Sequence, residues 1–394
     1  MKAFLYKARR SLLSCFLLTT AIGFCYAFSL FAPHAAARLG CSKTAVQFAF
    51  CLNIFFLGTG ASCFGALVER NIKKAAWLST ALLFAGLCVS GLAMKAGSLW
   101  AFYLGMGVLC GLSEGVGYVT PVKNLLLFFG RSGHKALVTA ISIVSFGLGS
   151  SICSFLFKYA YPAFGIDGVF FFYAGFYLLT TSVASLCIDK PRFAKIAAAK
   201  AGPGRRFSVA KYVRDPYFCQ CWLFMFLNIS MGLIIIGQCA GMLASGGLSP
   251  AAVVFVMMLC GLSNGAGRLV FPAVSDYMGK RIDVLLLALG LEIAALAAAM
   301  ADPRLTPAAF VLVNACYGAF FASLPAILSD HYGNSELSFV HGLCLQSWAS
   351  ASLFAFLTST FALGVLDFSQ NGLFAVLAAV YALNFVNVLS MRGR

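Results

Sequence analysis

One short pattern occurs twice in this chain, first as Gly65-Ala66-Leu67-Val68-Glu69-Arg70-Asn71-Ile72-Lys73-Lys74 and again as Pro272-Ala273-Val274-Ser275-Asp276-Tyr277-Met278-Gly279-Lys280-Arg281. The two copies lie 207 residues apart in a chain of 394 residues. In both, an apolar run ends at a small or turn-permitting residue, which is followed by an acid and a basic pair. Duplication of a multi-helix membrane unit is typical of secondary transporters. The pattern therefore predicts a membrane carrier with two related halves.

The composition supports a membrane protein. Hydrophobic residues make up 61% of the chain and charged residues 10%, against about 25% charged in ordinary soluble domains. Such a chain lacks the polar surface that water requires, so lipid is its expected solvent. The first apolar run, Leu12 to Phe31, is too long for a cleaved signal peptide and is expected to remain as a helix. The 15 Cys lie mostly in apolar runs and are expected to fill space, without a disulfide or metal framework.

The apolar runs predict twelve membrane-spanning helices, each of about 20 residues or more. Their expected ranges are 11–33, 45–68, 75–95, 99–129, 137–160, 168–188, 217–243, 251–278, 282–300, 308–330, 339–361 and 369–390. With both termini in the cytoplasm, 21 Lys and Arg lie on that side and 5 on the other. This asymmetry predicts cytoplasmic N and C termini. The net charge of +16 is then an orientation signal, and a nucleic-acid role is not expected.

The predicted fold is an all-α membrane protein with twelve transmembrane helices in two pseudo-symmetric six-helix bundles. Residues 1–188 form the first bundle and residues 217–394 the second. Residues 189–216 are expected to be a basic cytoplasmic linker that lies on anionic lipid headgroups. We expect a monomer in a bacterial inner membrane, with membrane lipids as its surroundings and no cofactor.

The duplicated pattern resembles the signature loop of the major facilitator superfamily, and the resemblance covers nearly the whole chain. It implies that these loops form an ion-pair latch between the bundles on the cytoplasmic side. The implied gating residues are Glu69, Arg70, Asp276, Lys280 and Arg281. The first copy departs from the family pattern at Ile72, where glycine is usual, which predicts a looser turn. The second copy has Tyr277 where arginine is common.

Further motifs resemble the oxalate/formate antiporter-type carriers, relatives of the monocarboxylate carriers. These motifs are Gly117-Tyr118-Val119-Thr120-Pro121-Val122, Asn264-Gly265-Ala266-Gly267-Arg268, Tyr317-Gly318-Ala319-Phe320-Phe321-Ala322 and Ser329-Asp330-His331-Tyr332-Gly333. The resemblance implies transport of small carboxylates. One departure is Trp348, which stands where the oxalate carrier has a lysine. This departure puts oxalate in doubt and favours a monoanion.

Arg268 is the strongest candidate for binding such an anion. A charge at mid-bilayer costs about 2.5–3.5 kcal/mol even on the lenient insertion scale, so it needs a partner or a wet cavity. Arg268 lies eight residues, about 12 Å of helix, before the expected cytoplasmic helix end at Asp276. Its planar guanidinium matches a carboxylate, and Asn264, one turn earlier, can orient it. The alternative is a structural ion pair with Glu114 or another acid.

Three other ionisable residues lie inside the expected spans. Lys123 follows Pro121, a position at which the helix should bend, and it either joins the site or reaches the headgroups. Glu114 is one turn before Tyr118 and is a candidate proton carrier. Its alternative is an ion pair with Lys123 or Arg268 that keeps an empty site neutral. Glu292 is expected to be structural or to face lipid.

Aromatic and amide side chains are expected to complete the site. Tyr26, Tyr118, Tyr317 and Trp348 lie on helices that line the central pathway in the resembled superfamily, and Tyr hydroxyls can bond a carboxylate. For each of the four, packing alone is the alternative. Gln346 is a further polar candidate.

These observations favour a secondary transporter of small organic anions, mono- or dicarboxylates, that works by alternating access as an antiporter or proton-coupled symporter. One alternative is an antiporter that exports drugs or lipophilic compounds, although Ser145–Ser151 lacks the proline of the corresponding motif. Another is a non-transporting membrane nutrient sensor. An enzyme is not expected, because the chain has no catalytic cluster, no His/Glu metal spacing and no phosphate-binding loop.

Overall fold

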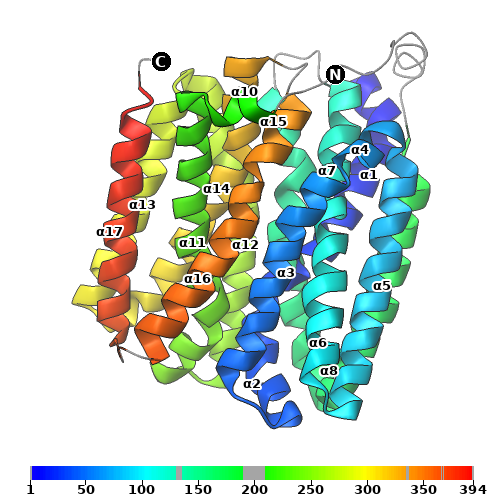
Figure 1. The fold of residues 1–394 in the computed structure, drawn as a ribbon, viewed down its shortest axis with the longest axis vertical. Helices are drawn as coiled ribbons and strands as arrows, with labels where there is room; N and C mark the ends of the chain where they lie inside the picture. The colour runs from blue at the N-terminus through cyan, green and yellow to red at the C-terminus, as the bar shows by residue number, and fades with distance from the viewer. Residues whose placement is uncertain are drawn as a thin grey trace.

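The computed structural model describes residues 2–129, 135–189, 209–333, 337–364, 366 and 368–392, and every regular element in these ranges is a helix (Figure 1). The first half contains α1 (Lys2–Ile22), η1 (Gly23–Ala27), α2 (Phe28–Leu39), α3 (Lys43–Cys63), α4 (Gly65–Arg70), α5 (Ile72–Ala96), α6 (Leu99–Phe102), η2 (Tyr103–Leu109), α7 (Cys110–Phe129) and α8 (Lys135–Cys187). The second half contains α10 (Val209–Val213), α11 (Pro216–Ser245), α12 (Pro250–Met278), α13 (Arg281–Ala301), η3 (Pro303–Leu305), α14 (Thr306–Tyr332), α15 (Leu337–Cys344), α16 (Gln346–Gly364) and α17 (Gln370–Leu389).

The helices account for the twelve expected membrane crossings. Eleven segments of the described chain are long and apolar enough to cross a bilayer, and one of them, 143–187, has 45 residues. A straight helix of that length would be about 68 Å long, twice the bilayer core. Gly165 breaks α8 with a φ of 63°, which glycine adopts without steric cost. The Tyr173 hydroxyl then donates a hydrogen bond to the carbonyl of Cys153 at 2.8 Å, so α8 folds back into two crossings.

The two copies of the duplicated pattern make their turns differently. In the second copy, Gly279 has a φ of 63° and ends α12, the usual role of glycine after a helix. In the first copy, Ile72 occupies the matching position and is already the first residue of α5. Asn71 instead has a non-helical backbone with a φ of −150° and a ψ of 86°, and its side chain accepts a hydrogen bond from the Lys74 amide at 3.1 Å. An N-cap thus replaces the missing glycine.

The first membrane span changes its pitch near its middle. α1 continues into the short 3-10 helix η1 and then into α2, and all five residues of η1 are buried. Gly23 lets this segment approach α8, since a Cβ atom at Gly23 would lie 1.9 Å from the carbonyl oxygen of Phe146. The tighter turn places Tyr26 toward the middle of the molecule.

The two halves lie side by side, and the N-terminal end of α1 and the C-terminal end of α17 lie at the same face of the molecule (Figure 1). α8 packs against α12, and α3 packs against α16. Small residues allow the first contact: a Cβ atom at Gly147 would lie 2.3 Å from the backbone nitrogen of Gly265. Close backbone approach of this kind is how helices associate in lipid. The domain boundaries 1–188, 189–216 and 217–394 remain our proposal, because residues 190–208 lie outside the described chain.

The glycine contact between the halves is testable by adding one methyl group. Gly147→Ala places a Cβ atom against the Gly265 backbone, which has no flexible side chain that could move aside. We expect a loss of about 1–3 kcal/mol of stability, the usual cost of overpacking, measured as a lower midpoint of thermal unfolding in detergent. Gly175→Ala is the matched control on α8, since nothing lies within 4 Å of its added methyl group. Equal midpoints for the two variants would contradict the close approach of α8 and α12.

Candidate functional site

Arg268 lies on α12 and is fully buried between the two halves. Its Nε donates a hydrogen bond to the Asn264 Oδ1 atom at 3.0 Å, because residues four apart share one face of a helix. This contact confirms the expected orientation of Arg268 by Asn264. Within the described chain, no acid forms an ion pair with Arg268, and its Nη1 and Nη2 atoms have no hydrogen-bond partner.

Two phenylalanine rings contact the guanidinium. The Arg268 Cζ atom lies 5.1 Å from the centroid of Phe146 on α8 and 5.3 Å from that of Phe321 on α14. Both rings are buried. A cation over a ring face is attracted by the ring quadrupole, by about 2 kcal/mol or more when desolvated. The two rings therefore offset part of the cost of burying this charge.

The expected aromatic residues surround the same two rings. Phe146 contacts Tyr26, Tyr118 and Trp348, with ring centroids 5.1, 5.8 and 6.1 Å away. Phe321 contacts Tyr118, Tyr317 and Trp348 at 6.3, 5.2 and 4.3 Å. The Tyr26 and Tyr317 hydroxyls form a hydrogen bond of 3.1 Å that joins the two halves. We call Tyr26, Tyr118, Phe146, Asn264, Arg268, Tyr317, Phe321 and Trp348 the central cluster.

Lys123 and Gln346 were also expected at the site. Lys123 is half-buried on α7, and Gln346 is half-buried at the first position of α16. No hydrogen bond, ion pair or ring contact joins either of them to Arg268 in the described part of the chain. Their assignment to substrate binding stays a prediction.

Glu114 lies in the first half, outside the central cluster. It is fully buried on α7, and its Oε1 atom accepts a hydrogen bond from the Asn53 amide at 3.1 Å. The same amide donates to the Met106 carbonyl at 3.0 Å, inside the π-helical turn η2. Neither Lys123 nor Arg268 pairs with Glu114 among the described ion pairs. Glu114 is thus held by an amide, without either of the ion pairs considered for it.

Glu292 is a second buried carboxyl group, in the other half. It is fully buried on α13 and accepts a hydrogen bond from the Asn228 amide of α11 at 3.3 Å. Of the two roles expected for it, its burial supports the structural one and contradicts a lipid-facing position.

The expected gating residues lie at the end of the molecule where α12, α13 and α14 meet. Arg281 donates a hydrogen bond to Asp276 at 2.7 Å and forms a second ion pair with Asp330. Lys280 and Arg70 are exposed, and the side chain of Glu69 lies outside the described residues. The described ion pairs therefore tie three helices of the second half together, and a latch between the halves stays a prediction.

Three residues of functional interest were missed by sequence reasoning. Phe146 and Phe321 are two of 39 phenylalanines, and no signal in the sequence separates them from packing residues. Asn53 carried a usable signal, because an amide inside an apolar run needs hydrogen-bond partners in lipid.

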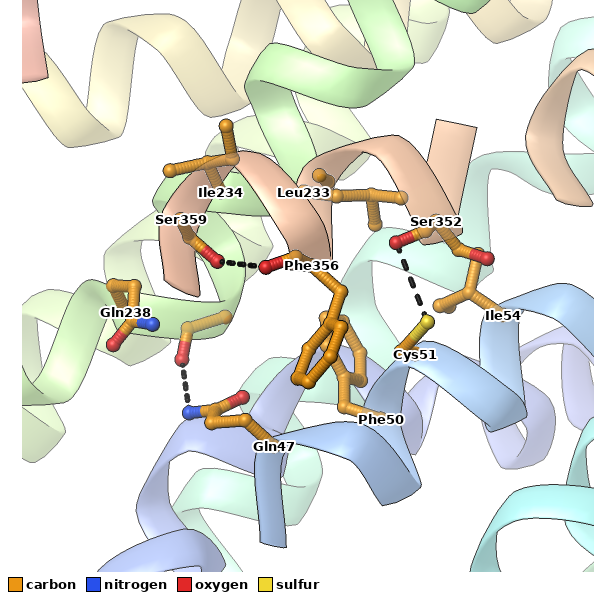
Figure 2. Close-up of a pocket in the computed structure, with 12 residues that line it drawn as sticks. Gln47, Phe50, Cys51, Ile54, Leu233, Ile234, Gln238, Ser352, Phe356 and Ser359 are labelled. Carbon is orange, nitrogen blue, oxygen red and sulfur yellow. Dashed lines mark hydrogen bonds between the residues drawn. The ribbon is translucent and has the colours of Figure 1, made fainter. Parts of the chain in front are cut away.

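A cavity opens between the halves, lined by α2 and α3 from one and α11 and α16 from the other. Its main part has a volume of about 220 Å³, and a smaller part of about 30 Å³ adjoins it. Figure 2 shows the smaller part, where the Gln47 side chain donates a hydrogen bond to the Gly237 carbonyl across the interface at 2.8 Å. We call these two parts the vestibule.

The vestibule approaches the central cluster from one side. Ser352 lines it and lies one helical turn, about 6 Å, beyond Trp348 on α16. Leu233 also lines it and follows Gly232, at which a Cβ atom would come within 2.2 Å of the Tyr317 ring. The α2–α3 turn beside the vestibule lies at the end opposite the chain termini (Figure 1).

The sequence matches the family profile of the Major Facilitator Superfamily over residues 12–356. The chain belongs to this superfamily, and it is a multi-pass membrane transporter rather than an enzyme.

Two relatives match most of the chain. It is 27% identical over 343 residues to the uncharacterized MFS-type transporter YhjX of Escherichia coli (strain K12), covering 84% of this chain and 83% of that protein. It is 24% identical over 337 residues to the oxalate:formate antiporter of Oxalobacter formigenes, covering 84% and 78%. Among solved structures, a bacterial homologue of the iron transporter ferroportin in the outward-facing state matches with a TM-score of 0.68 at 14% identity, covering 98% and 99% of the two chains. This last likeness concerns the fold alone.

The Arg281 ion pairs yield a prediction about the end of the molecule that carries them. Arg281→Gln removes both pairs and should lower stability by about 1 kcal/mol, as expected for partly exposed pairs. Lys280→Gln changes the same charge at the neighbouring exposed position and should leave the unfolding midpoint unchanged. If the two variants unfold at the same temperature, the Asp276–Arg281–Asp330 network does not hold these helices together.

Proposed function

We propose that the protein is a secondary transporter of small organic anions, mono- or dicarboxylates, and works by alternating access. The observation that carries the proposal is the fully buried Arg268 guanidinium, whose two terminal nitrogens have no partner in the described chain. Leaving a buried charge and its donors unpaired is costly. A carboxylate accepts two parallel hydrogen bonds from a guanidinium and cancels its charge, so such a ligand supplies what the empty site lacks.

The position of the central cluster supports transport through the middle of the protein. Tyr26, Tyr118 and Phe146 come from the first half, and the other five members come from the second. A ligand bound between two halves can be exposed to either side as the halves rock. The superfamily and the oxalate:formate antiporter among the relatives agree with this proposal.

We infer the orientation from charge. Lys and Arg are in excess in the loops on the same side as the termini, which favours cytoplasmic termini. In this orientation the vestibule opens to the outside. The relatives named above are bacterial, which supports a bacterial inner membrane. On the cytoplasmic side, we propose that Glu69, Arg70, Asp276, Lys280 and Arg281 take part in gating. We further propose that the transporter is a monomer.

Removal of the Arg268 charge tests the substrate class. Purified protein should be stabilised against heat by one or more of formate, lactate, pyruvate and oxalate, since a ligand that binds only the folded state raises its stability. Arg268→Gln should abolish this shift and reduce uptake of the same acid into vesicles at least about 100-fold, the effect of losing a charge-assisted pair of about 3 kcal/mol.

Arg304→Gln is the matched control, because Arg304 is exposed and lies in the short turn η3. A full ligand response in Arg268→Gln would refute the carboxylate assignment. Binding without uptake into vesicles would instead indicate a membrane sensor. Uptake of lipophilic compounds that compete with no acid would indicate drug export.

Glu114 is our candidate for proton coupling. It lies one turn before Tyr118 on α7, and its Oε2 atom has no hydrogen-bond partner. If the substrate neutralises Arg268, the empty carrier retains a buried charge and resists reorientation. Either a second substrate or a proton on Glu114 then compensates this charge, which gives exchange or symport.

Glu114→Gln separates the two coupling schemes. The amide keeps the size of the side chain and cannot exchange a proton. In a symporter, uptake driven by a pH gradient should fall to the background level, while exchange of labelled for unlabelled substrate continues. Glu292→Gln is the comparison, and it should retain the pH-driven uptake. A variant Glu114→Gln with unchanged response to the pH gradient would remove Glu114 from the coupling mechanism.

A further inference from the structure

Several hydrogen-bond donors in the central cluster lack an acceptor. Arg268 Nη1 and Nη2, Trp348 Nε1, Asn264 Nδ2 and the Tyr118 hydroxyl are all buried without a partner. All four residues are at most 1% exposed. Buried polar groups are paired in nearly all proteins, so each exception calls for an explanation. Here four side chains of the central cluster all have polar atoms that lack a hydrogen-bond partner.

The acceptors that the cluster contains are few, namely one amide oxygen and three tyrosine hydroxyls. The Asn264 oxygen already accepts from Arg268 Nε, and the Tyr26 and Tyr317 hydroxyls bond to each other. Trp and Arg side chains have no acceptor at all. Donors therefore outnumber acceptors in the cluster, and a ligand that brings several acceptor oxygens and few donors suits the site.

The charge of the site limits the ligand further. Within the described chain, Arg268 is the one basic side chain that lies over the rings of the central cluster. One guanidinium balances one negative charge, and a second buried charge would remain unpaired. The surrounding rings leave the rest of the ligand in apolar surroundings, which suits a short carbon skeleton.

We propose that the substrate is a short monocarboxylate with a second oxygen on the carbon next to the carboxylate, that is, a 2-oxo or 2-hydroxy acid. The Arg268 terminal nitrogens donate to the carboxylate, and Trp348 Nε1 and the Tyr118 hydroxyl donate to the second oxygen. This inference rests on the proposed anion transport and adds the chemical class of the anion. It assigns specificity to Trp348 and Tyr118 and charge recognition to Arg268.

The experiment compares acids that differ only at the second carbon. Dissociation constants of propionate, pyruvate and lactate are measured by calorimetry on the purified full-length protein. Pyruvate or lactate should bind about tenfold more tightly than propionate, since a site built to donate to an oxygen disfavours the analogue without it. In Trp348→Phe this ratio should fall to about two or less, because the indole donor to the second oxygen is lost.

A matched variant and a second donor variant complete the test. Trp222→Phe makes the same substitution on α11, where Trp222 stacks on Phe226 at 5.3 Å, and should keep the tenfold ratio. Tyr118→Phe removes only the hydroxyl and should also lower the ratio, which guards against a Trp348 variant that fails to fold.

The outcomes separate this inference from the proposed function. Equal binding of all three acids, lost in Arg268→Gln, would overturn the substrate class and leave anion transport intact. Tighter binding of oxalate than of pyruvate would overturn the monoanion. Absence of binding of any acid, or binding that persists in Arg268→Gln, would overturn the proposed function itself.

Discussion

The buried positive charge of Arg268 is the constraint around which the middle of this protein is built. A guanidinium with no exposed surface has lost the solvation of bulk water, so its neighbours have to stabilise it. Asn264 accepts from one nitrogen, and Phe146 and Phe321 supply the faces of two rings. None of the three carries a negative charge. The charge is tolerated by polarisable and dipolar neighbours, and in the proposed function a bound anion neutralises it.

The buried acids follow a different arrangement. Glu114 and Glu292 each lie within one half of the molecule, and each accepts a hydrogen bond from an asparagine of the same half. Arg268 lies between the halves and is paired with neither acid in the described chain. The protein thus keeps its internal charges apart, although an ion pair would have been the simplest way to bury them. In the proposed function, this separation leaves the guanidinium available to an anionic substrate.

The fold, and the grouping of several residues in the candidate site, could be predicted from the sequence for identifiable reasons. The twelve crossings followed from apolar length, and the pairing of Arg268 with Asn264 followed from their spacing of four residues. Tyr26, Tyr118, Tyr317 and Trp348 were recognisable because polar aromatic side chains are unexpected away from the membrane surfaces. Each of these signals depends on neighbours along the chain or on the polarity of a single residue.

The remaining features depend on contacts between distant segments. Phe146 and Phe321 look like any other phenylalanine until the fold places them against Arg268. Spacing alone could not decide whether Lys123 or Gln346 faces the cluster, because small rotations of a helix move a side chain from one neighbour to the next. The burial of Glu292 depends on how α11 and α13 pack, which the local sequence does not encode.

The contact of Gly147 with Gly265 has a mechanical consequence. Most packed helices interlock, with the side chains of one inserted between those of the other, and tilting them requires these side chains to disengage. At this point the backbones of Gly147 and Gly265 approach each other with no Cβ atom on either residue. At such a contact the crossing angle of the two helices can change with little change in side-chain rotamers. The two halves of the protein therefore meet, close to Phe146 and Asn264, at a contact whose geometry permits a change of crossing angle.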